Sequence, residues 1–224
     1  MLFSILGDVY RQGFFRENMG KRKATDVFSD WAKIGKDEGM ERGHGPSVSA
    51  MLDLALPKLR DDFTAIDIGC GNGWVVRLLN DIGASHAEGV DGAVEMINKA
   101  KEIDPKGLYS LATLPDWQPR KKFDFVHTME FLYYLKKPED FLKIVKENWM
   151  KEGGIFVAGV DHYLENEDSL TWPEHVGVHM TTYSINEWKD HMVNAGFSDV
   201  ELHQVASSEK FVGTLVMLGR VDAL

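Results

Sequence analysis

An acidic residue, a glycine cluster and a second acidic residue are the groups in this sequence whose types and spacing most clearly suggest chemistry. Asp67 precedes the cluster Gly69–Gly73, and Asp91 follows it. Glycines permit positive φ and let a ligand approach the backbone, while a helix that starts after them offers free N–H groups. An acidic residue about 20 positions beyond such a loop accepts hydrogen bonds from ribose hydroxyls. This pattern predicts a site for a nucleoside-containing cofactor.

The glycine spacing discriminates among such cofactors. Dinucleotide-binding folds use G-x-G-x-x-G, with a pyrophosphate at the helix end. Here the third glycine comes one residue early, and Trp74 stands in its place. The Asp67 carboxylate would repel a pyrophosphate but attract an ammonium or a sulfonium. A cationic cofactor is therefore favoured. Asp91 has a second interpretation, as the N-cap of a helix over 92–101.

The elements that must position these residues alternate between strand and helix from residue 64 onward. The pattern predicts an α/β fold, doubly wound, with a mostly parallel sheet covered on both faces. Predicted strands are 64–68, 86–90, 108–111, 123–129, 155–160, 197–205 and 211–218, the last two forming an antiparallel hairpin. Predicted helices are 74–82, 92–101, one from Pro138 that stops at Gly153-Gly154, and one capped by Ser184 that ends near Gly196.

Helical patterns also precede the first strand. Thr25 or Asp26 is expected to cap one helix, and Pro46 to start another. The chain is thus expected to divide into an N-terminal helical cover, 1–60, and a sheet domain, 61–224. Residues 162–182 show neither period clearly. Long loops in compact domains are usually functional, and the aromatic content argues against disorder, so we expect an ordered substrate loop there.

Composition narrows the class of protein. The net charge of −10 disfavours binding of nucleic acid through its phosphates. No apolar run is long enough to span a membrane, and the N-terminus is a poor signal peptide. The single cysteine, Cys70, excludes an internal disulfide. Together these features predict a cytoplasmic protein; they leave the oligomeric state open, with a monomer and a homodimer as the alternatives.

Five motifs give the sequence a family resemblance. They are DIGCGNG at 67–73, Asp91 in GVD, LP at 114–115, FDFVHTMEFLYYL at 123–135 and KEGGIFVAG at 151–159. With these motifs the chain resembles the class I S-adenosylmethionine-dependent methyltransferases. The resemblance implies a Rossmann-like seven-stranded sheet with a reversed final hairpin, and S-adenosylmethionine as the cofactor.

The resemblance also implies roles for single residues. Asp67 would approach the methionine amino group, Asp91 the ribose hydroxyls, and Gly92 or Met96 the adenine. Cys70 is interpreted as a filler of the loop, because no general base stands near it in sequence. The third-strand loop lacks an acidic or amide side chain for the adenine, so its backbone would substitute. The expected cofactor-binding residues are Asp67, Gly69, Cys70, Gly71, Asn72, Asp91, Gly92, Met96, Leu111, Ala112 and Thr128.

Candidates for the acceptor side come from the ends of the fourth and fifth strands. His162 is the predicted general base, because an unperturbed histidine titrates near neutrality. Glu130 and Asp161 are alternative catalytic groups that would hold a cationic amine. The expected substrate-binding residues are Trp31, Met40, Tyr133, Tyr134, Tyr163, Trp172, His175 and His179; Gly39 and His44 lie in the same N-terminal segment as the first two.

The spacing of His175 and His179 raises the question of a metal. Two histidines four residues apart point the same way only if the segment between them is helical, and Pro173 and Gly177 argue against a helix there. No metal is predicted. The leading hypothesis is a methyltransferase that acts on a small-molecule acceptor by in-line displacement. The alternatives are an aminopropyltransferase on the same fold and a non-enzymatic regulatory protein that binds the cofactor.

Overall fold

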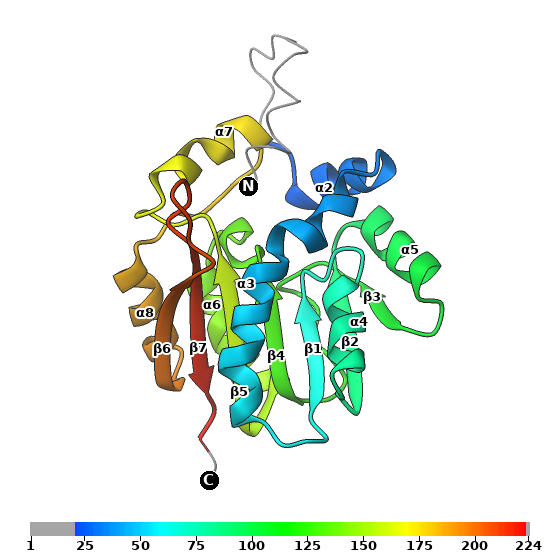
Figure 1. Ribbon diagram of the computed structural model, residues 1–224, viewed down its shortest axis with the longest axis vertical. Coiled ribbons are helices and arrows are strands. Elements are labelled where there is room, and N and C mark those ends of the chain that lie inside the picture. The colour runs from blue at the N-terminus through cyan, green and yellow to red at the C-terminus, as the bar shows by residue number, and fades with distance from the viewer. Residues whose placement is uncertain (1–20, 223–224) are drawn as a thin grey trace.

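One mixed seven-stranded sheet organises the computed structural model, which describes residues 21–222. Its strand order is β3-β2-β1-β4-β5-β7-β6 (Figure 1). The strands are β1 (Thr64–Ile68), β2 (His86–Asp91), β3 (Leu108–Leu111), β4 (Phe123–Met129), β5 (Met150–Val160), β6 (Ser198–Val205) and β7 (Thr214–Arg220). The first five are parallel, and β7 runs antiparallel to β5 and β6. The predicted fold class is confirmed.

Helices cover both faces of this sheet. They are α2 (Ala24–Lys33), α3 (Met40–Ala55), α4 (Trp74–Asp81), α5 (Val94–Ile103), α6 (Pro138–Ile144), α7 (Trp172–Val176) and α8 (Ile185–Asn194), with short 3-10 turns at Lys36–Gly39, Leu56–Lys58, Leu132–Tyr134 and Glu167–Thr171 and a π turn at Val145–Trp149. Side chains of α3, α4 and α5 share one core cluster, and those of α6 and α8 share the other. Since both faces are covered, the central strands are apolar almost throughout.

Alternation along β1 shows how the sheet separates the two cores. Ile66 and Ile68 pack into the cluster on the α6 and α8 side. Ala65 packs into the cluster under α3 and α4. Asp67 shares the face of Ala65 because side chains two apart along a strand point the same way. A buried carboxylate inside this otherwise apolar strand needs polar partners, and these form the site described below.

The two helix starts ahead of the first strand differ from the sequence prediction, whereas the start at Ser184 agrees with it. Ser184 forms the predicted capping box with Glu187. The N-cap of α2 is Lys23, not Thr25 or Asp26, and no side chain caps it. Pro46 lies inside α3, which already begins at Met40. The preceding residue is Gly45, whose missing Cβ relieves the clash that keeps other residues out of the helical region before proline.

Gly153 and Gly154 belong to β5 and do not stop a helix, which corrects the predicted role. The α-helix that begins at Pro138 ends at Ile144 and continues as the π turn. Gly153 has a φ of 73° and donates to the Val221 carbonyl at 2.8 Å. Gly154 accepts from the Val221 amide at 3.0 Å. The two glycines therefore extend pairing between β5 and the chain beyond β7.

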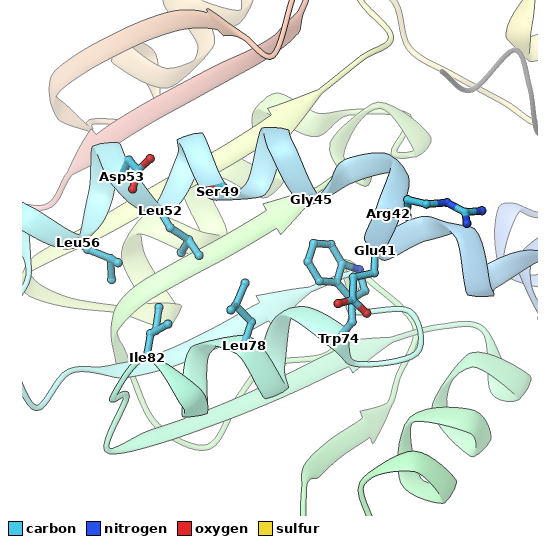
Figure 2. A pocket seen from close by; sticks show the side chains of 10 residues that line it. All are labelled: Glu41, Arg42, Gly45, Ser49, Leu52, Asp53, Leu56, Trp74, Leu78 and Ile82. Carbon is cyan, nitrogen blue, oxygen red and sulfur yellow. The ribbon is translucent and has the colours of Figure 1, made fainter.

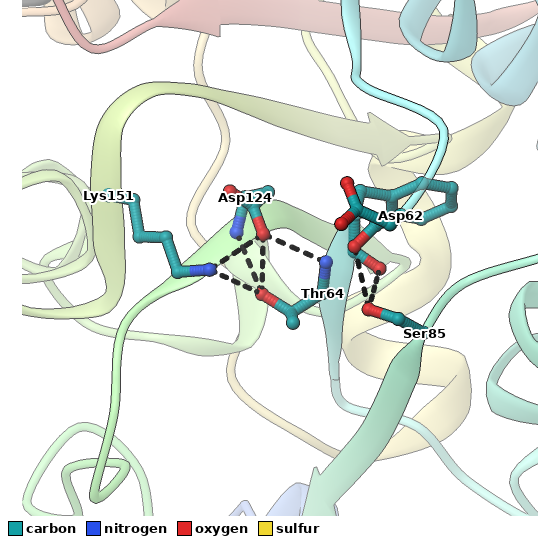
Figure 3. A network of polar contacts seen from close by, with 6 residues as sticks. Asp62, Thr64, Ser85, Asp124 and Lys151 are labelled. Carbon is teal, nitrogen blue, oxygen red and sulfur yellow. Dashed lines mark hydrogen bonds and ion pairs between the residues drawn. The ribbon is translucent and has the colours of Figure 1, made fainter.

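A polar network ties the strands together at the end of the sheet where β1 and β4 begin. One carboxylate oxygen of Asp124 accepts from the Thr64 amide, the Thr64 hydroxyl and the Lys151 ammonium at 2.9, 2.7 and 2.7 Å (Figure 3). In the same region the Ser85 hydroxyl donates to the Asp62 carbonyl at 2.6 Å. These bonds fix the beginnings of β1, β4 and β5 and leave their carboxyl ends free to form a site.

The expected N-terminal cover is described in part. Residues 21–60 form α2, a 3-10 turn, α3 and a second 3-10 turn, while 1–20 lie outside the described residues. The boundary at residue 60 stays a prediction. Within residues 21–222, no helix has the length and apolar character needed to cross a membrane.

Close packing behind the glycine loop gives a first testable prediction. A Cβ on Gly89 of β2 would lie 2.7 Å from the Cys70 sulfur and 2.9 Å from a Val76 methyl carbon. Overpacking of this kind costs about 1–3 kcal/mol, so Gly89→Ala should lower the free energy of unfolding by that amount in urea denaturation.

Gly43 of α3 provides the matched control. A Cβ there would meet nothing within 4 Å, and its φ is not positive. Replacement of a helical glycine by alanine gains about 0.5–1 kcal/mol. Gly43→Ala should therefore stabilise the protein, and equal effects of the two substitutions would contradict the packing argument.

Candidate active site

A cleft of about 840 Å³ opens at the carboxyl ends of β1, β2, β4 and β5. Open parallel sheets bind their ligands at this edge, and the volume lies in the usual range for small-molecule sites. Phe28 and Trp31 of α2 and Met40 and His44 of α3 line the cleft opposite the strand ends. Part of the 162–182 segment lines it as well, including Trp172 of α7.

The glycine loop between β1 and α4 adopts the backbone conformations for which glycine is suited. Gly69, Gly71 and Gly73 have φ angles of 72°, 52° and 77°. A Cβ on Gly73 would lie 2.4 Å from the Tyr109 ring, so this position admits only glycine. A Cβ on Gly71 would meet nothing nearer than the Met96 sulfur at 3.9 Å. Gly71 thus borders open space within the cleft, where a ligand can approach the backbone.

Asp91, at the end of β2, ties this loop to the next helix. One carboxylate oxygen accepts from the Gly71 amide at 2.9 Å, and the other from the Ala93 amide at 2.7 Å. Burial raises the pKa of Asp91, and the two amides oppose the shift. The N-cap of α5 is Ala93, so Asp91 is not the N-cap itself. A carboxylate accepts about four hydrogen bonds, which leaves capacity for ligand hydroxyls.

Asp67 lines the cleft one strand away and has a buried partner. Its Oδ1 lies 2.7 Å from Nδ1 of His127, the neighbouring residue on β4. The two residues are 3% and 0% exposed. Burial raises the pKa of Asp67, and His127 opposes the rise. His127 was not among the residues predicted for the site. Only the register of β1 against β4 brings its side chain to Asp67, and this register cannot be read from local sequence.

A second acidic pair occupies the ends of β4 and β5. Glu130 has a φ of 57°, rare for a residue with a Cβ, and accepts hydrogen bonds from the Tyr133 hydroxyl at 2.7 Å and from the Asp161 amide. The Thr214 hydroxyl donates to the Asp161 carboxylate at 2.6 Å. Burial and the Asp161 charge raise the pKa of Glu130 well above its usual 4.5. This end of the cleft concentrates buried acceptors.

Aromatic rings form one wall beside these carboxyl groups. The ring centroids of Phe28 lie 5.3 Å from those of both Trp31 and Tyr134, in edge-to-face contacts. Tyr133 and Tyr134 are 4.4 Å apart. All four line the cleft, and Phe28 was missed from the sequence because an aromatic on an amphipathic helix is ordinarily a core residue. Such rings attract a cation.

His44, and not His162, is the histidine that faces the acidic pair. Burial lowers the pKa of His44, and the Asp161 charge opposes the shift. His162 is 0% exposed, with Nδ1 3.0 Å from the Ser169 carbonyl and Nε2 2.8 Å from the Thr182 hydroxyl. Both nitrogens of His162 are engaged outside the cleft lining, so the geometry does not support it as the general base.

Several other predicted residues bond within the protein and do not line the cleft. The Asn72 amide donates to Asp37, the Thr128 hydroxyl to the Ile68 carbonyl, and the Tyr163 hydroxyl to the Gly213 carbonyl, at 2.8–2.9 Å. Leu111 and Ala112 do not line it either, because the chain turns inward only at the next residues. Thr113 and Leu114 take their place.

The histidine pair of the substrate loop is separated by the end of a helix. Pro173 was expected to oppose a helix but lies in the first turn of the short α7, and Gly177 ends that helix in a left-handed conformation. His175 therefore lies on α7 and His179 beyond it, and of the two only His179 lines the cleft. Among residues 21–222, no group of three or more potential ligands is placed to hold a metal ion.

Most of the predicted site residues do meet in the cleft. From the predicted cofactor set these are Asp67, Gly69, Cys70, Gly71, Asp91, Gly92 and Met96. From the predicted acceptor set they are Trp31, Met40, Glu130, Tyr133, Tyr134, Asp161, Trp172 and His179. Burial and the carboxylates of Asp91 and Asp67 raise the pKa of Cys70 well above its usual value, which fits a filler and not a nucleophile.

Basic side chains gather among the residues that line this cleft, in contrast to the acidic chain as a whole. The seven are Lys21, Arg22, Lys23, Lys36, Arg42, Lys136 and Lys210. Four carboxyl groups, those of Asp67, Asp91, Glu130 and Asp161, lie at the strand ends. The cleft therefore combines acidic groups on its floor with a basic contribution from the surrounding helices and loops.

A second hollow, of about 540 Å³, lies between α3 and α4. Leu52 of α3 and Leu56 just after it face Leu78 of α4 and Ile82 just after that helix, and Trp74 stands at the end of the hollow (Figure 2). Only Trp74 and Arg42 line both hollows. The lining of the second hollow also includes Glu41, Ser49 and Asp53, but none of the four carboxyl groups on the floor of the cleft.

Comparison with known proteins identifies the family. Residues 41–202 match the family described as "Methyltransferase domain". The chain belongs to this methyltransferase family. Its enzymes are S-adenosylmethionine-dependent, and related folds have been solved with S-adenosylhomocysteine bound. The cleft fits such a cofactor: its floor carries carboxylates that match positive charge and hydroxyls, and Gly71 leaves room beside the backbone.

The curated relatives act on different acceptors. A malonyl-[acyl-carrier protein] O-methyltransferase of Brevibacillus brevis is 26% identical over 92% of this chain and 80% of its own length. A trans-aconitate 2-methyltransferase of Agrobacterium fabrum is 26% identical over 64% of this chain. The chain spans only 53% of that relative. Matches to tRNA U34 carboxymethyltransferases are 30% identical over less than half of the chain. The acceptor therefore does not follow from the family.

A solved structure from Haloferax volcanii is similar over nearly the whole described fold. It is the methyltransferase partner in a complex with the Trm112 methyltransferase activator, 26% identical, with a TM-score of 0.78. The match covers 88% of this methyltransferase and 99% of that chain. The N-methyltransferase NodS of Bradyrhizobium japonicum, at 16% identity and a TM-score of 0.62, shares the fold.

The raised pKa of Glu130 makes stability depend on pH in a defined direction. The folded state binds this proton more tightly than the unfolded state, whose pKa lies near 4.5. The stabilisation is complete below that value and is lost as pH rises through the folded pKa. The stability of the wild type relative to Glu130→Gln should therefore fall with rising pH, in denaturation without cofactor.

Glu201 gives a control of opposite sign. Hydrogen bonds from Lys58 and His203 lower the pKa of its carboxyl group. The stability of the wild type relative to Glu201→Gln should rise with pH. A pH-independent difference between wild type and Glu130→Gln would show that Glu130 carries no raised pKa.

Proposed function

We propose that this methyltransferase transfers a methyl group to the nitrogen of a small organic amine by in-line displacement. The observation that carries the proposal is the acidic pair Glu130 and Asp161, which faces a wall of aromatic rings. Within residues 21–222 no lysine or arginine side chain lowers the pKa of Glu130; the Tyr133 hydroxyl and the Asp161 backbone amide are the groups that do. A cationic amine would supply the missing positive charge.

The residues at one end of the cleft would then bind the cofactor, and those at the other end would bind the acceptor. Asp67 and Asp91 hold the α-ammonium and the ribose hydroxyls of S-adenosylmethionine, which supplies a sulfonium-bound methyl group. Glu130 and Tyr134 orient the acceptor nitrogen. An ammonium must lose a proton before it attacks. Burial lowers the pKa of His44, which favours the neutral imidazole that would accept this proton. Alignment and exclusion of water provide most of the acceleration.

The seven basic side chains of the cleft favour an acceptor whose other end is anionic, because they attract negative charge toward the mouth. A small amine that also carries a carboxylate or a phosphate matches both ends of the cleft. The family match favours methyl transfer over the aminopropyl transfer considered from the sequence. It also favours an enzyme over a regulatory protein that only binds the cofactor.

A matched acceptor panel tests this proposal. Small amines with and without a carboxylate, together with alcohols and carboxylates of the same skeletons, are incubated with labelled S-adenosylmethionine. Methyl transfer should occur only to amines. Glu130→Gln should reduce kcat/KM about 10- to 100-fold, by loss of one charged contact.

Cofactor binding serves as the control for that panel. The Glu130→Gln variant should bind S-adenosylhomocysteine as the wild type does in calorimetry. Turnover of an alcohol or a carboxylate, and not of its matched amine, would contradict the amine assignment while leaving the methyltransferase intact. A wild-type protein that transfers methyl to a tRNA and to no small molecule would contradict the proposal as a whole.

A protein partner is a second proposal. The Haloferax relative was solved with the Trm112 activator, and β3 is the terminal strand on one side of this sheet. Leu108 and Leu111 of β3 are 48% and 52% exposed. A terminal strand has unpaired backbone groups that a partner strand can satisfy. We propose that a Trm112-like protein binds at this edge.

Co-elution with Haloferax volcanii Trm112 in size-exclusion chromatography tests whether such a protein binds at the β3 edge of the sheet. The wild type should form a complex, and Leu111→Lys should lose it. Leu164→Lys is the control, since Leu164 is 50% exposed but lies in the substrate loop. No complex with the wild type, or equal loss with both variants, would contradict binding at β3.

A further inference from the structure

Asp67 and His127 form a buried pair, and neither cofactor binding nor catalysis has so far been assigned to His127. The two residues are direct neighbours in the parallel pairing of β1 and β4. Side chains of register partners leave the sheet on the same face, here the face under α3 and α4. Their contact is therefore fixed by strand pairing and does not depend on a mobile loop.

The hydrogen bond between them defines which atom donates. In the ionised state that would bind an ammonium, the Asp67 carboxylate only accepts, so Nδ1 of His127 then carries the hydrogen that bridges the 2.7 Å to Oδ1 of Asp67. Nε2 of His127 is buried and makes no hydrogen bond in the described part of the chain. Within the described residues, the hydrogen bond to Asp67 is therefore the only one that the His127 ring makes.

The other oxygen of Asp67 is the one left for a ligand. No hydrogen bond to Oδ2 is formed by residues 21–222, and Asp67 lines the cleft. Fixing Oδ1 prevents the carboxylate from rotating away. The hydrogen bond from His127 also opposes the rise in the pKa of Asp67 that burial imposes, which favours the ionised carboxylate. Both effects favour an ammonium at Oδ2.

We propose that His127 is a positioning residue for the cofactor: by donating to Oδ1 of Asp67, it holds Oδ2 toward the α-ammonium of S-adenosylmethionine. This inference rests on the proposed contact between Asp67 and that ammonium. It goes further in assigning part of the cofactor affinity to a side chain that lies outside the cleft lining and touches no ligand.

Two ligands separate this role from a merely structural one. S-adenosylhomocysteine carries the α-ammonium, and 5′-methylthioadenosine has the same nucleoside but lacks the amino-acid portion. Calorimetry measures the affinity of both for each variant. A damaged fold would weaken both ligands, whereas a misplaced Asp67 carboxylate weakens only the first.

Leucine and asparagine are matched substitutions at position 127. Both branch at Cγ and have nearly the same shape, but only asparagine offers a donor where Nδ1 of the histidine stood. His127→Leu should weaken S-adenosylhomocysteine about tenfold or more and leave 5′-methylthioadenosine nearly unchanged, as expected for loss of a hydrogen bond to a charged group. His127→Asn should retain most of the affinity for both ligands.

The Asp67→Asn variant distinguishes the two ways in which the inference can fail. If Asp67→Asn leaves the ratio of the two affinities unchanged, the ammonium does not bind at Asp67, and the proposed cofactor contact is wrong. If Asp67→Asn changes that ratio but His127→Leu and His127→Asn behave alike, the contact stands and the positioning role of His127 is overturned. Equal weakening of both ligands by His127→Leu also overturns it.

Discussion

Four carboxyl groups that have no lysine or arginine partner among residues 21–222 are the constraint on which the rest of the site depends. Asp67 and Asp161 are buried, and Asp91 and Glu130 are half-buried; all four line the cleft. Burial of a carboxylate is costly unless hydrogen bonds or opposite charge compensate. The compensation within the protein comes from backbone amides, from hydroxyl groups and from His127. A cofactor and an acceptor that carry positive charge complete it.

The fold places these groups together because parallel strands end at one edge. Each acidic residue stands at or near the carboxyl end of a different strand, so the pairing order of β2, β1, β4 and β5 sets their sequence along the cleft floor. The glycine loop then brings its backbone close enough for Asp91 to hold Gly71. The glycine loop and Asp91 therefore form a single structural unit, although 20 positions separate Gly71 from Asp91 in the sequence.

The local sequence pattern was sufficient to predict the strands of the sheet and the cofactor loop, since both depend on residues that are close in the sequence. It was insufficient wherever a contact joins distant segments. His127 meets Asp67 only through strand register, and Phe28 and His44 reach the cleft only because α2 and α3 fold back over the sheet. His162 looked like a base because it follows a strand end, but its ring turns into the segment of Ser169 and Thr182. Pro46 and Pro173 were misjudged because tertiary packing overrides local helix signals.

A crystal structure of the complex with S-adenosylhomocysteine tests most directly whether the enclosed carboxyl groups define the cofactor site. We predict ribose hydroxyls within hydrogen-bond distance of Asp91, the α-ammonium at Oδ2 of Asp67 with His127 still bonded to Oδ1, and the sulfur directed toward Glu130. A ligand bound in the reverse direction, or one whose ammonium lies away from Asp67, would contradict the claim that the enclosed carboxylates define this site.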